Sequence, residues 1–209
     1  MLTIAQPRNE GLTIDGTTCN GVPRATCNGV PRATCNAVPR AAGEILSIGG
    51  IEPESIVDGP GFRYTVFVQG CNFRCPGCHN AQLQPFTGGR SVTVGELLDA
   101  IRCNPLLDGL TLSGGDPFTQ AASCAALAEE VRALGLSVMT YTGYTWEALL
   151  AADNPDWWRL IMATDVLVDG PFIRELRNID LFFRGSSNQR LIDVGRSLGA
   201  GMVVVMPGE

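Results

Sequence analysis

The chain is poor in charged residues and in long apolar runs. Charged residues make up 17% of its 209 residues, and the net charge is −6. Nucleic-acid-binding surfaces are normally basic, so this composition speaks against nucleic acid as a partner. No apolar run approaches the ~20 residues that a membrane-spanning helix needs, and the first residues lack the apolar core of a secretory signal. We therefore expect a cytoplasmic protein that binds neither nucleic acid nor membrane.

Apolar residues and glycine, by contrast, are abundant. Hydrophobic residues make up 45% of the chain and there are 25 glycines, which suits an α/β core with many tight turns. The expected strands cover residues 45–48, 63–69, 109–113, 136–140, 165–168 and 202–205. The expected helices cover residues 93–102, 118–133, 146–163 with a break near Pro155, and 172–177.

The alternation of strands and helices predicts a parallel sheet with crossover helices. A capping box from Thr93 to Glu96 marks the start of one of these helices. The chain offers about five or six strand–helix units, whereas a closed eight-fold barrel typically takes ~250 residues. We therefore expect an α/β fold in which residues 44–209 form an incomplete, open (β/α) barrel of about six units.

Residues 1–43 differ from the rest of the chain. Residues 19–42 are a tandem octad, CNGVPRAT twice and then CNAVPRAA. With a proline in each unit and few apolar residues, the repeat offers too little surface to offset the entropy of ordering it. We expect a disordered tail here. The alternative is a second metal site at Cys19, Cys27 and Cys35, although seven-residue gaps without a companion histidine or acid suit metal binding poorly.

The most distinctive motif follows the expected strand at residues 63–69. Cys71, Cys75 and Cys78 have the spacing C-x3-C-x2-C. Three thiolates on one loop can converge on one soft metal centre and leave it one ligand short. Tetrahedral zinc with His79, the only histidine, is one alternative, but structural zinc sites usually pair two distant knuckles. A four-iron cluster with one open iron is the other.

The remaining cysteines of the domain are isolated. Cys103 and Cys124 have no cysteine or histidine close by in the sequence. A free cysteine of this kind usually behaves as a small core residue. We expect both to lie in the core.

Polar and glycine-rich segments follow four of the expected strands. Cys71 follows the first, Gly114-Gly115-Asp116 the second, Tyr141-Thr142-Gly143 the third and Asp169-Gly170 the fourth. The carboxyl ends of parallel strands meet at one edge, where such sheets bind their ligands. The sequence therefore predicts one site built from all four segments.

The cysteine spacing, after the first strand of a partial α/β barrel, resembles that of the radical S-adenosylmethionine (SAM) enzymes. The lead-in at residues 57–63 and the segment at residues 67–71 are similar to those of the glycyl-radical-enzyme activases. Further motifs resemble the activases of anaerobic ribonucleoside-triphosphate reductase, at residues 112–117, 142–144, 166–170 and 184–189. These matches run in order from about residue 45 to 194, and the tail lies outside them.

The resemblance implies a role for each matching residue. Cys71, Cys75 and Cys78 would bind a [4Fe–4S] cluster whose fourth iron is chelated by SAM. The residues implied to bind SAM are Gly77, Cys78, His79, Gly114, Gly115, Asp116, Thr142 and Asp169. Arg63 and Arg184 would contact the SAM carboxylate or a partner, with surface ion pairing as the alternative. No catalytic side chain beyond the cluster and SAM is implied.

The implied activity is an oxidoreductase reaction. The reduced cluster would cleave SAM, and the 5′-deoxyadenosyl radical would take a hydrogen atom from a glycine on a loop of the large subunit of anaerobic ribonucleoside-triphosphate reductase. A low-potential donor such as flavodoxin or ferredoxin would supply the electron. The alternatives are an activase of another glycyl radical enzyme, of the pyruvate formate-lyase type, a small-molecule radical SAM enzyme, and a zinc-binding module without catalysis.

Overall fold

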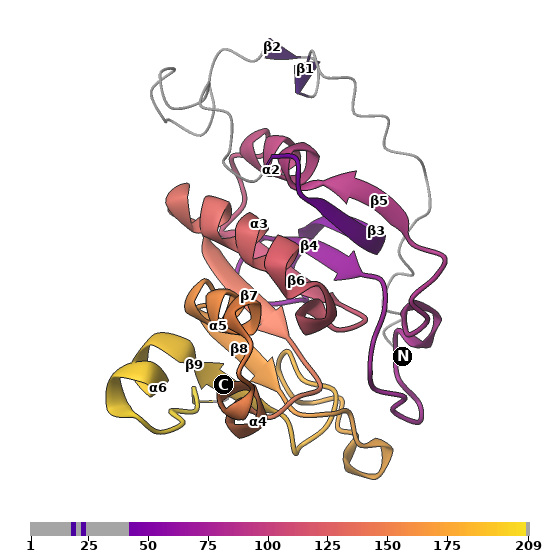
Figure 1. Ribbon diagram of the computed structural model, residues 1–209, viewed down its shortest axis with the longest axis vertical. Helices are drawn as coiled ribbons and strands as arrows, with labels where there is room; N and C mark the ends of the chain where they lie inside the picture. The colour runs from indigo at the N-terminus through magenta and orange to yellow at the C-terminus, as the bar shows by residue number, and fades with distance from the viewer. Residues whose placement is uncertain (1–17, 20–21, 24–41, 208–209) are drawn as a thin grey trace.

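The computed structural model describes residues 18–19, 22–23 and 42–207. Within residues 42–207 a seven-stranded sheet runs in the order β5-β3-β4-β6-β7-β8-β9 (Figure 1). Its strands are β3 (Ile45–Ser55), β4 (Arg63–Val68), β5 (Arg90–Thr93), β6 (Gly109–Gly114), β7 (Ser137–Tyr141), β8 (Val166–Asp169) and β9 (Arg190–Asp193). The four central strands, β4, β6, β7 and β8, are parallel, whereas β3, β5 and β9 pair antiparallel with their neighbours.

Helices connect the parallel strands and lie in front of the sheet in Figure 1. The α-helices are α2 (Val94–Arg102), α3 (Ala121–Ala133), α4 (Trp146–Ala151), α5 (Pro155–Met162) and α6 (Val194–Ala200). Short 3-10 turns are η1 (Ala81–Leu83), η2 (Pro117–Gln120) and η3 (Arg174–Leu176). A separate two-residue ladder pairs β1 (Thr18–Cys19) with β2 (Val22–Pro23).

The two faces of the sheet differ in character because successive side chains of a strand point to opposite sides. On the helix side, Val66, Leu112 and Leu167 join the main apolar core with α2, α3 and α5. On the other side, Met139 and Val168 belong to a smaller cluster that Phe183 covers. The main core therefore fixes the sheet and its helices, and the opposite face is covered by loops.

Most predicted elements are confirmed at close to the predicted bounds. Thr93 caps α2, with both hydrogen bonds of the capping box present. Asn154 caps α5, and Pro155 stands at its first turn and separates it from α4. These local signals act within one helical turn, so the sequence alone reveals them.

Other expectations need correction. The strand expected at 45–48 continues to Ser55, and β5, β9 and α6 were not predicted. In place of the strand expected at 202–205 there is one bridge, between Val205 and Ile192. The sheet is mixed rather than wholly parallel, since β3, β5 and β9 pair antiparallel with their neighbours. The α/β class is confirmed.

Two further expectations concern the cysteines and the tail. Cys124 is fully buried, as predicted. Cys103 is only half-buried, so the prediction of a core residue is wrong there. The tail prediction for 1–43 lies outside the described residues except for 18–19, 22–23 and 42–43. Within the described part of the chain, no helix has the length and apolarity needed to cross a membrane.

Candidate functional site

The cysteine loop leaves the carboxyl end of β4 and is anchored at its base. The N–H groups of Gly70 and Cys71 donate to the carbonyls of Leu83 and Gln84, at 2.8 and 3.0 Å. Inside the loop, the N–H of Cys78 donates to the carbonyl of Cys75 at 3.1 Å. These bonds anchor the loop at the carboxyl end of β4 and form a turn between Cys75 and Cys78.

All three cysteines of the loop are free and half-buried. The pKa of the Cys71 thiol is raised to about 11, chiefly by burial and to a smaller extent by Asp116 and the other two thiols, while a hydrogen bond from the Phe73 N–H acts in the opposite direction. Burial also raises the pKa of Cys75. Within the described residues, no group of three His, Cys, Asp or Glu side chains is placed so that it could hold a metal ion. Iron binds the thiolate, so metal binding would release these protons.

Two glycines let the end of β6 lie flat against the base of the cysteine loop. Gly114 has a φ of +100°, and a Cβ atom there would stand 2.5 Å from the Val68 nitrogen. A Cβ on Gly115 would stand 2.1 Å from the carbonyl oxygen of Gly70. The Gly115 N–H donates to the Val68 carbonyl at 2.8 Å. Close packing between strands thus explains both glycines, whatever else approaches them.

Asp116 and Thr142 lie side by side beneath the rim. The Thr142 hydroxyl contacts both carboxylate oxygens of Asp116, at 3.2 and 3.0 Å. The N–H groups of Phe118 and Gly143 donate to the same carboxylate, at 2.9 and 3.0 Å. Asp116 is 0% exposed, and burial raises its pKa to about 6 although these hydrogen bonds oppose the shift. Its carboxylate is surrounded by protein donors.

Asp169, at the end of β8, is also buried and engaged with protein groups. Its carboxylate accepts a hydrogen bond from the Trp146 N–H at 2.7 Å and forms an ion pair with Arg190. Arg190 also pairs with the exposed Glu147 at 2.9 Å. This arrangement joins β8, β9 and the first turn of α4.

Gly77 and His79 are exposed at the far side of the cysteine loop. Gly77 has a φ of +75°, a conformation that favours glycine. The Arg174 side chain lies 3.4 Å and Phe172 lies 3.7 Å from where its Cβ would stand. The segment after β8 therefore packs over the cysteine loop, and its Phe172 N–H also lowers the pKa of Cys75. The sequence contains no local signal for this contact.

The two arginines considered for the site lie in different places. Arg63 is 1% exposed at the amino end of β4, the end of the sheet opposite the cysteine loop. Arg63 cannot reach SAM at the rim from this end of the sheet, so that expectation is wrong, and the exposed Asp108 is among the charges that act on its guanidinium. Arg184 is half-buried after β8, and its Nε has no protein partner. The side-chain oxygen of Asn188 is likewise buried and unpartnered, while its amide donates to the Pro171 carbonyl at 2.8 Å.

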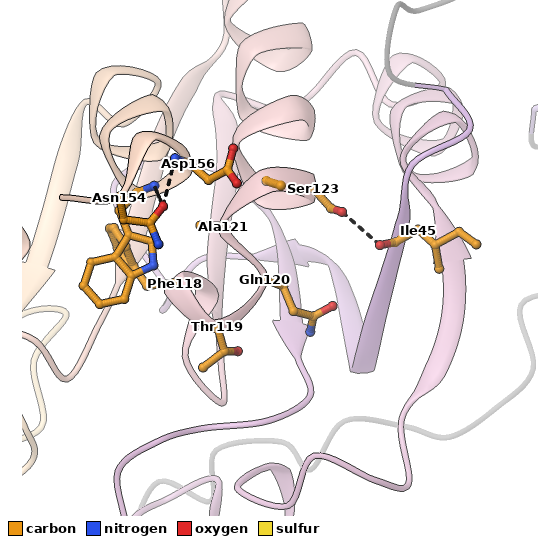
Figure 2. Close-up of a pocket in the computed structure, with 10 residues that line it drawn as sticks. Ile45, Phe118, Thr119, Gln120, Ala121, Ser123, Asn154 and Asp156 are labelled. Atoms are coloured by element: carbon orange, nitrogen blue, oxygen red, sulfur yellow. Dashed lines mark hydrogen bonds between the residues drawn. The ribbon is translucent and has the colours of Figure 1, made fainter. Parts of the chain in front are cut away.

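Aromatic rings lead from the cysteine loop toward a hollow on the helix side. The Phe73 and Tyr144 rings are 4.8 Å apart, and Tyr144 and Trp157 are 4.6 Å apart, measured between centroids. Trp157 helps to line a hollow of about 360 Å³, together with Phe118, Thr119 and Asn154 (Figure 2). None of the predicted site residues lines this hollow. The predicted site residues therefore lie at the carboxyl ends of the strands and not in this hollow.

The sequence of the chain matches the model of an iron–sulfur family. The family described as "4Fe-4S single cluster domain" matches residues 57–192, from the turn before β4 into β9. The match spans all four central strands and the cysteine loop. The chain belongs to this family, so the protein is an iron–sulfur protein with a single cluster.

Similar proteins narrow the family further. The anaerobic ribonucleoside-triphosphate reductase-activating protein of Escherichia coli K12 is 37% identical over 147 residues, which cover 66% of this chain and 92% of that protein. The protein of the same name from Vibrio cholerae is 37% identical, and the match covers 66% of this chain and 91% of that protein. The protein of the same name from phage T4 is 31% identical, and the match covers 68% of this chain and 90% of that protein. The chain belongs to the anaerobic ribonucleoside-triphosphate reductase-activating proteins.

One solved structure overlaps part of the fold. QueE from Escherichia coli covers 48% of this chain and 53% of its own chain, with 16% identity and a TM-score of 0.38. This likeness is too weak to carry an argument.

A [4Fe–4S] cluster and SAM are the cofactors of this family, and the residues at the rim fit them. Cys71, Cys75 and Cys78 supply the soft sulfur ligands that an iron–sulfur cluster takes. The buried, unpartnered atoms of Arg184 and Asn188 offer one donor and one acceptor to a polar ligand near Pro171 and Phe172. The site thus has both the ligand set for the cluster and unmet polar groups nearby.

Proposed function

We propose that this protein is a radical SAM activating enzyme that generates a glycyl radical on anaerobic ribonucleoside-triphosphate reductase. The observation that carries the proposal is the cysteine loop. Three free cysteines, and no fourth, lie on one rim loop of a chain whose relatives are named for activating this reductase. Three ligands leave one iron of a four-iron cluster open to a further molecule.

The rim residues divide into cluster ligands and neighbours of SAM. Cys71, Cys75 and Cys78 would hold the cluster. When bound, the cluster and SAM supply one-electron cleavage of the SAM carbon–sulfur bond, which yields methionine and a 5′-deoxyadenosyl radical. Gly77 and His79 would lie against SAM from the exposed side of the loop, and Gly114 and Gly115 would offer their backbone from the end of β6.

The side chains of three residues predicted to bind SAM instead form hydrogen bonds that stabilise the protein around the rim. The side chains of Asp116, Thr142 and Asp169 are buried and bonded to protein groups. Their backbones line the rim, so contact with SAM through backbone atoms stays a prediction. We see no side-chain acid or base that the reaction needs, because a radical takes a hydrogen atom rather than a proton.

The partner would approach the rim over the segment that follows β8. This segment exposes Leu176, Ile179 and Phe182, and Ile179 is 82% exposed. It also packs on the cysteine loop through Phe172 and Arg174. The glycine-bearing loop of the reductase large subunit would enter beside this segment. Such an entry needs a rim that is open on this side. Hydrogen-atom transfer from the glycine Cα would give 5′-deoxyadenosine and the glycyl radical.

The proposal extends to the fold, the domain boundaries and the location of the protein. Four parallel strands with helices on one face support an incomplete, open barrel formed by residues 44–209, with 1–43 as a separate tail. The electron would come from a low-potential donor such as flavodoxin or ferredoxin in the cytoplasm. An activase of the pyruvate formate-lyase type is the alternative, favoured by the histidine and asparagine at positions 79 and 80.

Anaerobic reconstitution tests the proposal. We expect about four iron and four sulfide per chain, SAM cleavage on reduction, and a glycyl radical signal in electron paramagnetic resonance when the reductase is added. A signal on pyruvate formate-lyase instead would assign the alternative partner. Stoichiometric zinc without SAM cleavage would overturn the enzyme assignment and leave a zinc-binding module.

A further inference from the structure

Asp116 and Thr142 join the ends of two neighbouring strands beneath the cysteine loop. Asp116 follows β6 and Thr142 follows β7. Their side chains meet at 3.0 Å, and Thr142 is also held by its own N–H, which donates to the Val168 carbonyl at 2.9 Å. Because both side chains are buried, water cannot replace this bond when it is lost.

From this pair, one arm reaches the base of the cysteine loop. The Asp116 N–H donates to the Gly70 carbonyl at 2.9 Å. Thr119, in η2 beside the hollow of Figure 2, donates its hydroxyl to the Asp116 carbonyl at 2.7 Å. Asp116 therefore fixes the residue directly before Cys71.

A second arm reaches the middle of the loop. The Gly143 N–H donates to Asp116, and a Cβ on Gly143 would stand 2.4 Å from the Phe73 ring. The Thr142 hydroxyl also accepts from the Tyr144 N–H at 3.1 Å, and the Tyr144 hydroxyl accepts from the Asn72 side chain at 2.9 Å. The residues between Cys71 and Cys75 thus rest on a backbone that Thr142 and Asp116 hold in place.

We propose that Thr142 and Asp116 are positioning residues that set the placement of Cys71 and Cys75 through Gly70, Gly143 and Phe73, and that their side chains do not bind SAM. The expected effect on SAM cleavage rests on the proposed function. The placement of the loop itself does not, because all the contacts involved are within the protein.

The hydroxyl of Thr142 is the part of the arrangement that substitution can remove most selectively. Valine has the same shape as threonine but can neither donate to Asp116 nor accept from Tyr144. Serine keeps both bonds. Thr142→Val and Thr142→Ser therefore separate the hydrogen bonds from the volume of the side chain. Thr140→Val is the matched control, since Thr140 lies in β7 two residues before Thr142 and its buried hydroxyl forms a hydrogen bond of 2.8 Å with that of Thr164.

Hydrogen exchange on the full-length, metal-free chain is the first measurement. In Thr142→Val we expect the amides of residues 70–80 to exchange roughly 10-fold faster, because local opening costs less once the support is lost. Thr142→Ser and Thr140→Val should stay within about twofold of the wild type there. Unchanged exchange in Thr142→Val, with the chain folded, would overturn the proposal.

Kinetics of the reconstituted protein give the second measurement. In Thr142→Val we expect kcat for SAM cleavage to fall on the order of 10-fold with little change in the KM for SAM, because misplaced reacting groups slow the reaction. A raised KM at unchanged kcat and unchanged exchange would mean that Thr142 binds SAM, which contradicts the proposal. If the wild type itself builds no cluster, the proposed function fails, while the exchange experiment still decides the positioning role.

Discussion

Arg63 donates a hydrogen bond of 2.6 Å to the hydroxyl of Ser137, which lies 74 positions further along the chain. The same guanidinium also donates to Thr111 at 3.1 Å and to the carbonyl of Leu110. One buried cation thus holds together the amino ends of β4, β6 and β7. Burial lowers its pKa to about 10, which still leaves it charged at neutral pH.

Removing this guanidinium should cost stability. In Arg63→Met, buried hydroxyl and carbonyl acceptors lose their donors, so we expect the free energy of unfolding to fall by about 2–4 kcal/mol. Urea unfolding of the metal-free chain measures this. The control Arg177→Met changes an exposed arginine and should stay within about 0.5 kcal/mol of the wild type. Equal losses in both variants would contradict the role given to Arg63.

The cluster should depend on each cysteine of the loop and on no other cysteine in residues 42–207. Cys75→Ala removes a ligand, so we expect loss of the brown colour, of bound iron and of SAM cleavage after reconstitution. Cys124→Ala is the matched control, because Cys124 is buried in the core. It should keep its iron at some cost in stability. Full iron content in Cys75→Ala would exclude this residue as a ligand.

Asp116 should make stability depend on pH. Burial raises its pKa from 3.8 to about 6, so the folded chain holds this proton more tightly than the unfolded chain. The resulting stabilisation is complete below about pH 4 and is lost as the pH rises through about 6, a change of about 3 kcal/mol. Cys71 and Cys75, which face it, have raised pKa values and stay protonated in this range.

Asp116→Asn isolates this contribution. The asparagine does not titrate, so the variant does not lose this contribution as the pH rises. The unfolding free energy of the variant minus that of the wild type should therefore increase by up to about 3 kcal/mol from pH 4 to pH 7. Urea unfolding of the metal-free chain at several pH values measures the difference. A difference that is constant with pH would show that the carboxyl group does not titrate in this window.

The ion pair at the end of β8 should be sensitive to loss of its arginine. In Arg190→Met the Asp169 carboxylate stays buried without its cation, and we expect a loss of about 3–5 kcal/mol in unfolding free energy. Glu147→Gln removes only the exposed partner of Arg190 and should cost less than about 1 kcal/mol. Thermal or urea unfolding of both variants distinguishes the two contacts.

The segment before residue 42 should be dispensable for the chemistry. Ala42 accepts a hydrogen bond from the N–H of Gly95 at 3.2 Å and should be kept. A chain that begins at residue 42 should therefore fold, bind its cluster and cleave SAM at the rate of the full chain. Loss of cluster assembly in the shortened chain would show that the octad takes part in the site.

Elements with strong local signals could be predicted from the sequence, and those that depend on distant contacts could not. The capping box at Thr93 and the proline at 155 act within one helical turn, which is why α2, α4 and α5 were found. The strand β9 is only four residues long and follows a loop, so its pattern does not stand out. It forms because β8 offers an edge for pairing.

The site followed the same rule. The cysteine spacing and the two glycines at the end of β6 are local signals, so the sequence alone could bring these segments together in one predicted site. The burial of Arg63 was not, because arginine is normally exposed and its acceptors come from two other strands. The bond between Asp116 and Thr142 spans 26 residues. No periodicity records such a pairing, which appears only once β6 and β7 lie side by side.

The ring contacts from Phe73 to Trp157 give the protein an optical probe of its own. Trp157 is two ring contacts away from the cysteine loop, through Tyr144. Iron–sulfur chromophores absorb where tryptophan emits, so filling of the loop should quench the indole fluorescence of the unlabelled chain. Cluster assembly and loss in air can then be followed in real time, and Trp157→Phe identifies the share of the signal that comes from this residue.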